Sequence, residues 1–188
     1  MRAIVVFESM YGNTRHIAEA IADGLRWSIP TEVVIAGDAA DMDLEDVDLV
    51  VVGGPTHAWG LSSKRTREGA KKDAIKHPDH VLDDAQAAIG IREWLQNAHF
   101  HHACRGVSFD TRLDKPQALT GSAARSIQRR LRHAGLTSFD RPQSFRVTGM
   151  AGPLAPGEIE RAGQWGEAMG RTIVPRTEKK LAASRSAG

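Results

Sequence analysis

The sequence predicts a doubly wound α/β fold, a three-layer sandwich in which helices cover both faces of a five-stranded parallel sheet. Two short, continuous apolar runs, 3–7 and 49–52, are rich in β-branched residues, as strands buried on both faces are. Between such runs lie amphipathic repeats; the first has apolar residues at every fourth position, at Ile17, Ile21 and Leu25. Strands that alternate with helices are typical of a parallel sheet.

The remaining elements follow in chain order. We expect strands at 33–35, 104–109 and 145–147, the last with an earlier half at 136–139, and helices at 14–26, 91–98, 122–133 and from Pro156 to 173. The polar stretch 61–86 is expected to hold a helix or two. No repeat or linker divides the chain, so we expect one domain over 1–174 and a disordered tail over 175–188.

Composition excludes several classes of protein. The 188 residues are 41% hydrophobic and 26% charged, which is typical of a globular domain. A net charge of +2 is far from the basic stripe of a nucleic-acid-binding protein. No apolar run is long enough to cross a membrane, and the run at 3–7 is too short for a secretory signal. With a single cysteine, the chain is expected to be cytoplasmic.

The loop after the first strand has the composition of a phosphate site. It reads Ser9, Met10, Tyr11, Gly12, Asn13 and Thr14, and it leads into a helix. Helix N-termini carry unpaired N–H groups and partial positive charge, so a phosphate monoester fits there. The loop has neither the lysine of a nucleoside-triphosphate loop nor the three glycines of a dinucleotide loop. A receiver domain is also excluded, because the strand at 49–52 ends in Gly53-Gly54-Pro55 rather than in an aspartate.

This loop, with the helix that follows, resembles the FMN phosphate loop of flavodoxins. The resemblance extends over most of the chain and implies strand order 2-1-3-4-5, with FMN at the carboxyl ends of the strands. It implies a flavin site in the loop Pro55, Thr56, His57, Ala58, Trp59 and Gly60, with Trp59, or else His57, stacked on the ring. An ordinary capped helix and a core tryptophan are the structural alternatives.

A third loop, Phe109, Asp110, Thr111 and Arg112, is expected beside the flavin. Flavodoxins often place a second aromatic residue here, and Phe109 is the candidate, although it could instead belong to the strand and point into the core. Asp110 and Thr111 are expected to meet the pyrimidine edge, and Arg112 to favour an anion. Turn capping by Asp110 and a solvated Arg112 are the alternatives.

Three further features have mainly structural interpretations. Basic residues from Lys64 to Lys76 form a solvated helix face or a docking surface for an acidic partner. The histidines His99, His101 and His102 lie too close together for a metal site, and no metal is expected. Cys104 is expected to be a core residue.

The function implied is that of an FMN-binding redox protein. It would carry electrons to a partner protein or reduce a small acceptor such as a quinone. No partner that is a nucleic acid is expected. The alternative is a flavodoxin-like scaffold that has lost FMN and serves as a protein-interaction module.

Overall fold

A computed structural model of the chain describes residues 1–57, 60–77, 82, 89–101 and 103–174. Its central sheet consists of β2 (Thr31–Ile35), β1 (Ala3–Phe7), β3 (Leu49–His57) and β5 (Arg105–Leu113), paired in parallel in that order. The fifth position is shared by β6 (Thr137–Ser138) and β7 (Gln143–Val147), both parallel to β5. The expected order 2-1-3-4-5 and the divided last strand are confirmed. A short strand, β4 (Gly60–Leu61), adds an antiparallel hairpin to β3.

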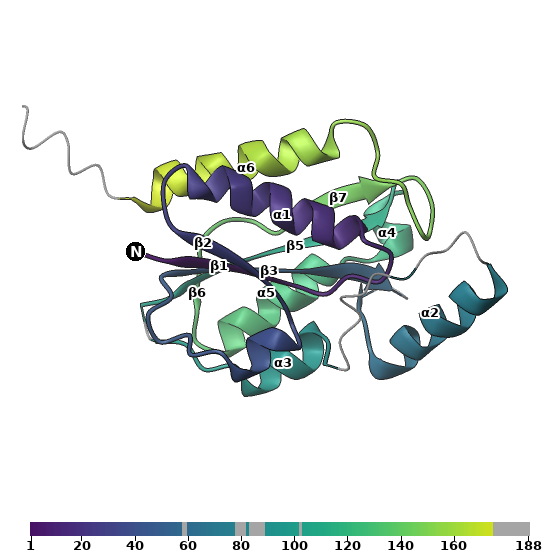
Figure 1. Cartoon of the computed structure of the whole chain (residues 1–188), viewed down its shortest axis with the longest axis horizontal. Helices are drawn as coiled ribbons and strands as arrows, with labels where there is room; N and C mark the ends of the chain where they lie inside the picture. Colours follow the sequence, from purple (N-terminus) through teal and green to yellow (C-terminus); the bar gives the residue numbers. More distant parts are fainter. Residues whose placement is uncertain (58–59, 78–81, 83–88, 102, 175–188) are drawn as a thin grey trace, which may run out of the picture.

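Helices form layers on both faces of this sheet (Figure 1). On one face lie α1 (Asn13–Arg26) and α6 (Glu158–Ile173); on the other lie α3 (Ile91–Asn97) and α5 (Ala123–His133). The remaining helices are α2 (Lys64–Lys76), α4 (Gln117–Thr120) and the 3-10 turn η1 (Asp38–Asp41). No described helix is both long and apolar enough to cross a membrane.

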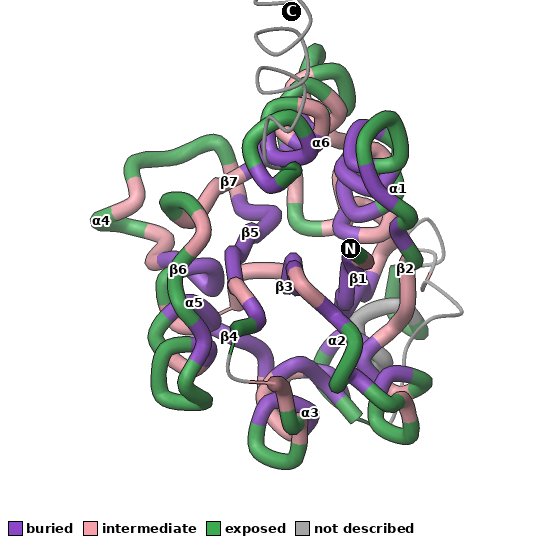
Figure 2. The backbone as a smooth tube through the Cα atoms, turned by 90° about the vertical axis from the view of Figure 1, so that its left-hand side faces the viewer, coloured by how far each residue is buried: buried purple, intermediate pink, exposed green. Residues whose placement is uncertain are grey.

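Alternation along the strands divides the interior into two cores. In β1, Val5 and Phe7 face α1 and α6, whereas Ile4 and Val6 face α3 and α5. Both cores lie against the same sheet, in which β1 is buried along its whole length and β5 is buried except at its two ends (Figure 2). A parallel sheet covered on both faces explains why its strands read as continuous apolar runs.

Several expected boundaries are wrong. The strand expected at 104–109 continues to Leu113, because β7 pairs with β5 from Phe109 onward and prolongs the ladder. The last helix begins at Glu158 rather than at Pro156, with Gly157 as its N-cap at φ +81°. The helix expected within 61–86 is α2, and the tail at 175–188 lies outside the described residues.

Candidate functional site

The loop after β1 leads into the N-terminus of α1, which has no side-chain cap. Gly12, at φ +83°, is the N-cap residue of α1, and no side chain caps the helix there. The first backbone bond of α1 runs from the His16 N–H to the Gly12 carbonyl at 3.1 Å, and the first turn carries no acidic side chain. Positive φ favours glycine at this position. The end of α1 therefore offers N–H groups and positive potential to an anion.

Hydrogen bonds fix the position of this loop. Within it, the Gly12 N–H donates to Ser9 Oγ at 3.1 Å, and Ser9 is fully buried. Thr14 Oγ1 lies 2.8 Å from Thr111 Oγ1 on β5. The Asn13 amide donates to the carbonyl of Ala151 at 3.0 Å. The helix start is thus joined both to the sheet edge and to the loop that follows β7.

A cavity of about 220 Å³ opens at the carboxyl ends of β3 and β5 beside this loop. Predicted site residues supply nine of its lining positions: Met10, Tyr11, Asn13, Thr14, Pro55, Thr56, His57, Thr111 and Arg112. The remaining wall was missed by sequence reasoning and consists of Leu113, Val147, Gly149 and Met150. The exposed Met150 in a glycine-rich segment after a strand is the signal that could have indicated it.

Three buried side-chain atoms at this edge lack a hydrogen-bond partner: His57 Nε2, Asp110 Oδ1 and Arg112 Nε. Within the described part of the chain, no other buried side-chain nitrogen or oxygen is left unpaired. Buried polar atoms are normally paired, so their concentration in one place marks a site built for something other than stability. Burial lowers the pKa of His57, and burial followed by the charge of Arg146 lowers the pKa of Arg112.

Asp110 has a structural role at the start of α5, and its contact with a flavin stays a prediction. It is fully buried within β5, and its Oδ2 accepts hydrogen bonds from Thr56 Oγ1 at 3.0 Å, Ser122 Oγ at 2.7 Å and the Ala124 N–H at 2.9 Å. The carboxylate thereby caps the N-terminus of α5, where negative charge is favourable. Arg112 also belongs to the strand, and its Nη1 donates to the Lys115 carbonyl and to Thr120 Oγ1.

Phe109 does not cover a ligand. It is fully buried in the core beneath α1 and α6, where its ring meets Phe145 edge-on at 6.1 Å. A Cβ on Gly53 would lie 2.0 Å from this ring, so glycine is required there. Of the two positions that the sequence left open for Phe109, the structure shows the one in the core. Its side chain lies on the face of β5 that α1 and α6 cover.

The second predicted loop is only partly described. Trp59 lies outside the described residues, as does Ala58. Gly60 pairs with His57 across the β3–β4 hairpin and lies at the edge of a different groove, between α3 and α5. Among the described residues of this loop, Pro55, Thr56 and His57 reach the cavity.

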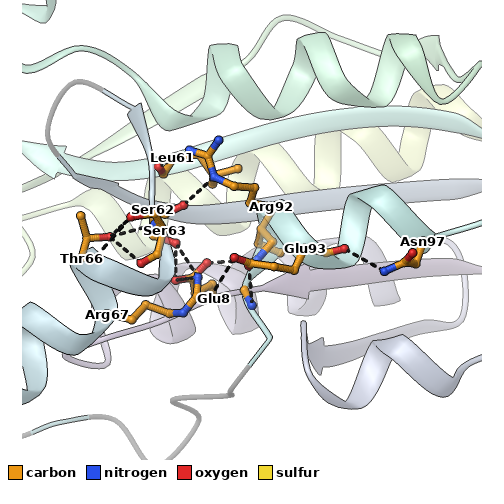
Figure 3. A network of polar contacts seen from close by, with 11 residues as sticks. Glu8, Leu61, Ser62, Ser63, Thr66, Arg67, Arg92, Glu93 and Asn97 are labelled. Carbon is orange, nitrogen blue, oxygen red and sulfur yellow. Dashed lines mark hydrogen bonds and ion pairs between the residues drawn. The ribbon is translucent and has the colours of Figure 1, made fainter.

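A buried polar network behind β1 anchors the segment that carries the basic helix (Figure 3). Glu8 accepts hydrogen bonds from Ser62 Oγ and from the Ile91 N–H at 3.1 Å, and it lies 3.7 Å from Arg67. Arg67 also pairs with Glu93 at 3.1 Å. Arg67 was counted in the basic surface, but it is only 5% exposed and ties α2 to β1 and α3.

The histidine and cysteine residues before β5 have separate structural surroundings. His101 Nε2 lies 2.8 Å from the carbonyl of Val47, and His102 lies outside the described residues. Cys104 belongs to the core, as expected, and burial followed by the charge of Asp48 raises the pKa of its thiol to about 11. It is therefore an inert thiol.

The sheet order, the phosphate-type loop and the cavity at the strand ends define a flavodoxin-like protein. Residues 4–67 match the family model described as a flavodoxin domain. None of the curated protein sequences compared with the chain matches it. The chain is thus flavodoxin-like in sequence over its first third and in fold over most of its length.

Solved structures with the same fold include flavodoxins and a related protein. Oxidised flavodoxin 2 from Bacillus cereus aligns with a TM-score of 0.63 and 14% identity, over 92% of this chain and 99% of that one. A flavodoxin from Streptococcus pneumoniae TIGR4 aligns at 0.58 and 17%, over 92% and 99%. A WrbA-like flavodoxin protein from Agrobacterium tumefaciens aligns at 0.51 and 17%, over 92% and 96%.

Proposed function

We propose that the chain binds FMN at the carboxyl edge of its sheet and acts as a redox protein. The open N-terminus of α1 carries this proposal. Its first turn has no side-chain cap, lies next to Gly12 and the Thr14 hydroxyl, and carries no carboxylate that would compete with a phosphate. A bound flavin would supply the redox chemistry, while the protein would hold it and set its surroundings.

The residues around the cavity suit the rest of the cofactor. Pro55, Thr56 and His57 would border the ring from β3, and Thr111 and Arg112 from β5. The cavity is smaller than the roughly 300–1,000 Å³ typical of ligand pockets, so it would take part of the flavin while the remainder lies over the open edge. With Phe109 in the core, Tyr11 and Met150 are the lining side chains whose flat or apolar surface could cover a ring.

The phosphate assignment is tested with Asn13→Asp. This nearly isosteric change adds one negative charge at the first residue of α1, where carboxylates suit the helix but repel a phosphate, and it removes the hydrogen bond to the Ala151 carbonyl, whose loss affects riboflavin and FMN alike. We expect FMN to bind at least about tenfold more weakly, as two like charges a few ångströms apart would cause. Riboflavin, which lacks the phosphate, should lose much less affinity, because only the lost hydrogen bond affects it. Quenching of flavin fluorescence during titration measures both affinities.

Gln164→Glu on the exposed side of α6 is the matched control, because it adds the same charge away from the cavity. It should change neither affinity. An Asn13→Asp protein that folds and binds FMN as tightly as the wild type would show that the phosphate lies elsewhere.

The redox role is proposed as either a carrier between proteins or a reductase of a small acceptor. The exposed lysines and arginines of α2, among them Lys64, Arg65, Lys72 and Lys76, favour a carrier that docks on an acidic partner. Turnover of a nicotinamide cofactor with a quinone by the flavin-loaded protein would instead identify a reductase.

The burial of Phe109 favours one alternative, a module that has kept the fold without the cofactor. A colourless protein that does not bind added FMN would support that alternative.

A further inference from the structure

A second cavity lies outside the flavin edge, in the groove between α3 and α5. Its volume is about 850 Å³, within the range typical of small-molecule sites. The β4 end of the hairpin closes one end of the groove at Gly60 and Leu61. The walls come from the two helices and from the chain after α3: Arg92, Leu95, Gln96, Ala98, His99, Phe100, Ser126, Arg129, Arg130, His133 and Ala134.

Three arginines give this groove its charge. The Arg92 side chain is held in place because its Nε donates to the Ser62 carbonyl at 3.0 Å and its Nη2 to the Leu61 carbonyl at 2.9 Å (Figure 3). Neither bond neutralises its charge, since both acceptors are uncharged carbonyls. The guanidinium groups of Arg129 and Arg130 have no hydrogen-bond or ion-pair partner among the described residues. None of the described residues that line the groove carries a carboxylate.

The positive charges of the other two arginines affect the pKa of Arg130. Burial, followed by the charges of Arg92 and Arg129, lowers the pKa of Arg130. The carboxylate of Glu93 acts in the opposite direction on Arg130, but it is itself paired with Arg67 at 3.1 Å. The three positive charges line the same groove and act unfavourably on Arg130. A bound anion would relieve that repulsion, because guanidinium groups bind phosphate oxygens through paired hydrogen bonds.

We propose that this groove binds a nucleotide-sized ligand through a diphosphate or triphosphate group. The phosphates lie against Arg92, Arg129 and Arg130, and the apolar part of the ligand lies against Phe100 and Leu95. Phe100 is positioned for this contact, because its ring packs edge-on against Trp94 at 6.0 Å. More than one negative charge is required, since three guanidinium groups converge and a monoanion would leave most of their repulsion in place.

The site is independent of the proposed flavin site. It lies over the α3–α5 face, and its lining shares no residue with the cavity at the start of α1. Binding at the groove can therefore be measured with the flavin edge intact and with saturating FMN present.

Isothermal titration calorimetry of the whole chain with ADP, inorganic pyrophosphate and adenosine tests the proposal. We expect ADP and pyrophosphate to bind with affinities that fall as salt is added, and adenosine to bind at least about tenfold more weakly than ADP. Arg129→Gln and Arg130→Gln should each weaken ADP binding about tenfold, the loss expected for one charge-assisted contact. Gln96→Glu, which adds a negative charge to the exposed rim without removing an arginine, should weaken it as well.

Two controls locate the binding. Arg132→Gln removes the same charge from an exposed position of α5 outside the groove and should leave ADP affinity within about twofold, since separated surface charges interact weakly. Asn13→Asp changes the α1 loop, and it should leave the ADP affinity unchanged. The proposal is overturned if neither ADP nor pyrophosphate binds, if the arginine variants bind as the wild type does, or if Asn13→Asp alone abolishes binding. Binding of an acidic peptide but not of ADP would also overturn it, in favour of a protein partner.

Discussion

At the scale of single residues, two buried charged side chains, Asp110 in β5 and Arg67 in α2, join elements that are distant in sequence. Asp110 caps α5 and joins it to β3, and Arg67 holds α2 against Glu8 and Glu93. Each is almost fully buried, so removal of one partner would leave an uncompensated charge. Sequence reasoning placed Arg67 on the surface, whereas it is buried; Asp110 caps α5 through Oδ2 and keeps Oδ1 without a hydrogen-bond partner.

His57 provides a prediction about pH. Burial lowers its pKa in the folded protein below the ordinary value of 6.5. As the pH falls through and below 6.5, the unfolded chain therefore binds a proton at this residue that the folded chain does not. The wild type should lose stability relative to His57→Gln over that range. Urea unfolding of both proteins at pH 8, 6.5 and 5 measures the difference, and a difference that is constant or grows in favour of the wild type would contradict it.

The candidate site could be predicted from the sequence only where local chemistry determines it. Gly12 and Thr14 were found because a helix start after a buried strand has a recognisable pattern. The direction of Phe109 was left open, and Asp110 was expected in a loop, because the length of β5 depends on its ladder with β7, which is distant in sequence. The cavity wall around Met150 was missed for the same reason. The loop after β7 reaches the cavity only because β7 pairs with β5, and this pairing cannot be seen in the local sequence.

At the scale of elements, α1 and α6 pack with their backbones in direct contact. A Cβ on Gly24 would lie 2.1 Å from the Gly163 carbonyl oxygen, and one on Gly166 would lie 2.1 Å from the Ile21 carbonyl oxygen. Both clashes involve backbone atoms, which cannot rotate away as a side chain does. The glycines therefore determine how closely the two helices approach each other on this face of the sheet.

Gly24→Ala should destabilise the protein by about 2 kcal/mol, because the clash exceeds the gain in helix propensity. The matched change is Gly69→Ala in α2, where an added Cβ meets no atom within 4 Å. That variant should be more stable than the wild type by about 0.5–1 kcal/mol. Denaturant unfolding measures both changes. A Gly24→Ala protein as stable as the wild type would mean that the two helices are further apart than described here.

The elements themselves were largely predictable. The helical repeat at Ile17, Ile21 and Leu25 and the apolar runs at 3–7 and 49–52 identified the correct elements, because burial imposes those periods directly. The hairpin strand β4 was not found, since its two residues have no periodicity and depend on pairing with β3.

At the scale of the whole molecule, the parallel sheet brings loops that are distant in sequence to one edge. The start of α1, the end of β3, the end of β5 and the loop after β7 meet around one cavity. The β3–β4 hairpin has His57 on that cavity and Gly60 on the arginine-rich groove between α3 and α5. The fold therefore places two candidate anion sites, one at a helix N-terminus and one among arginines, on either side of one hairpin.

The central claim is that the edge beside α1 holds FMN. The most direct measurement is the visible absorption spectrum of the purified chain, followed by titration of the flavin-free protein with FMN while flavin fluorescence is recorded. The account predicts a flavin spectrum, or saturable quenching at one FMN per chain that is weakened in Asn13→Asp and unchanged in Gln164→Glu. A colourless, folded protein that leaves the fluorescence of added FMN unchanged would contradict it.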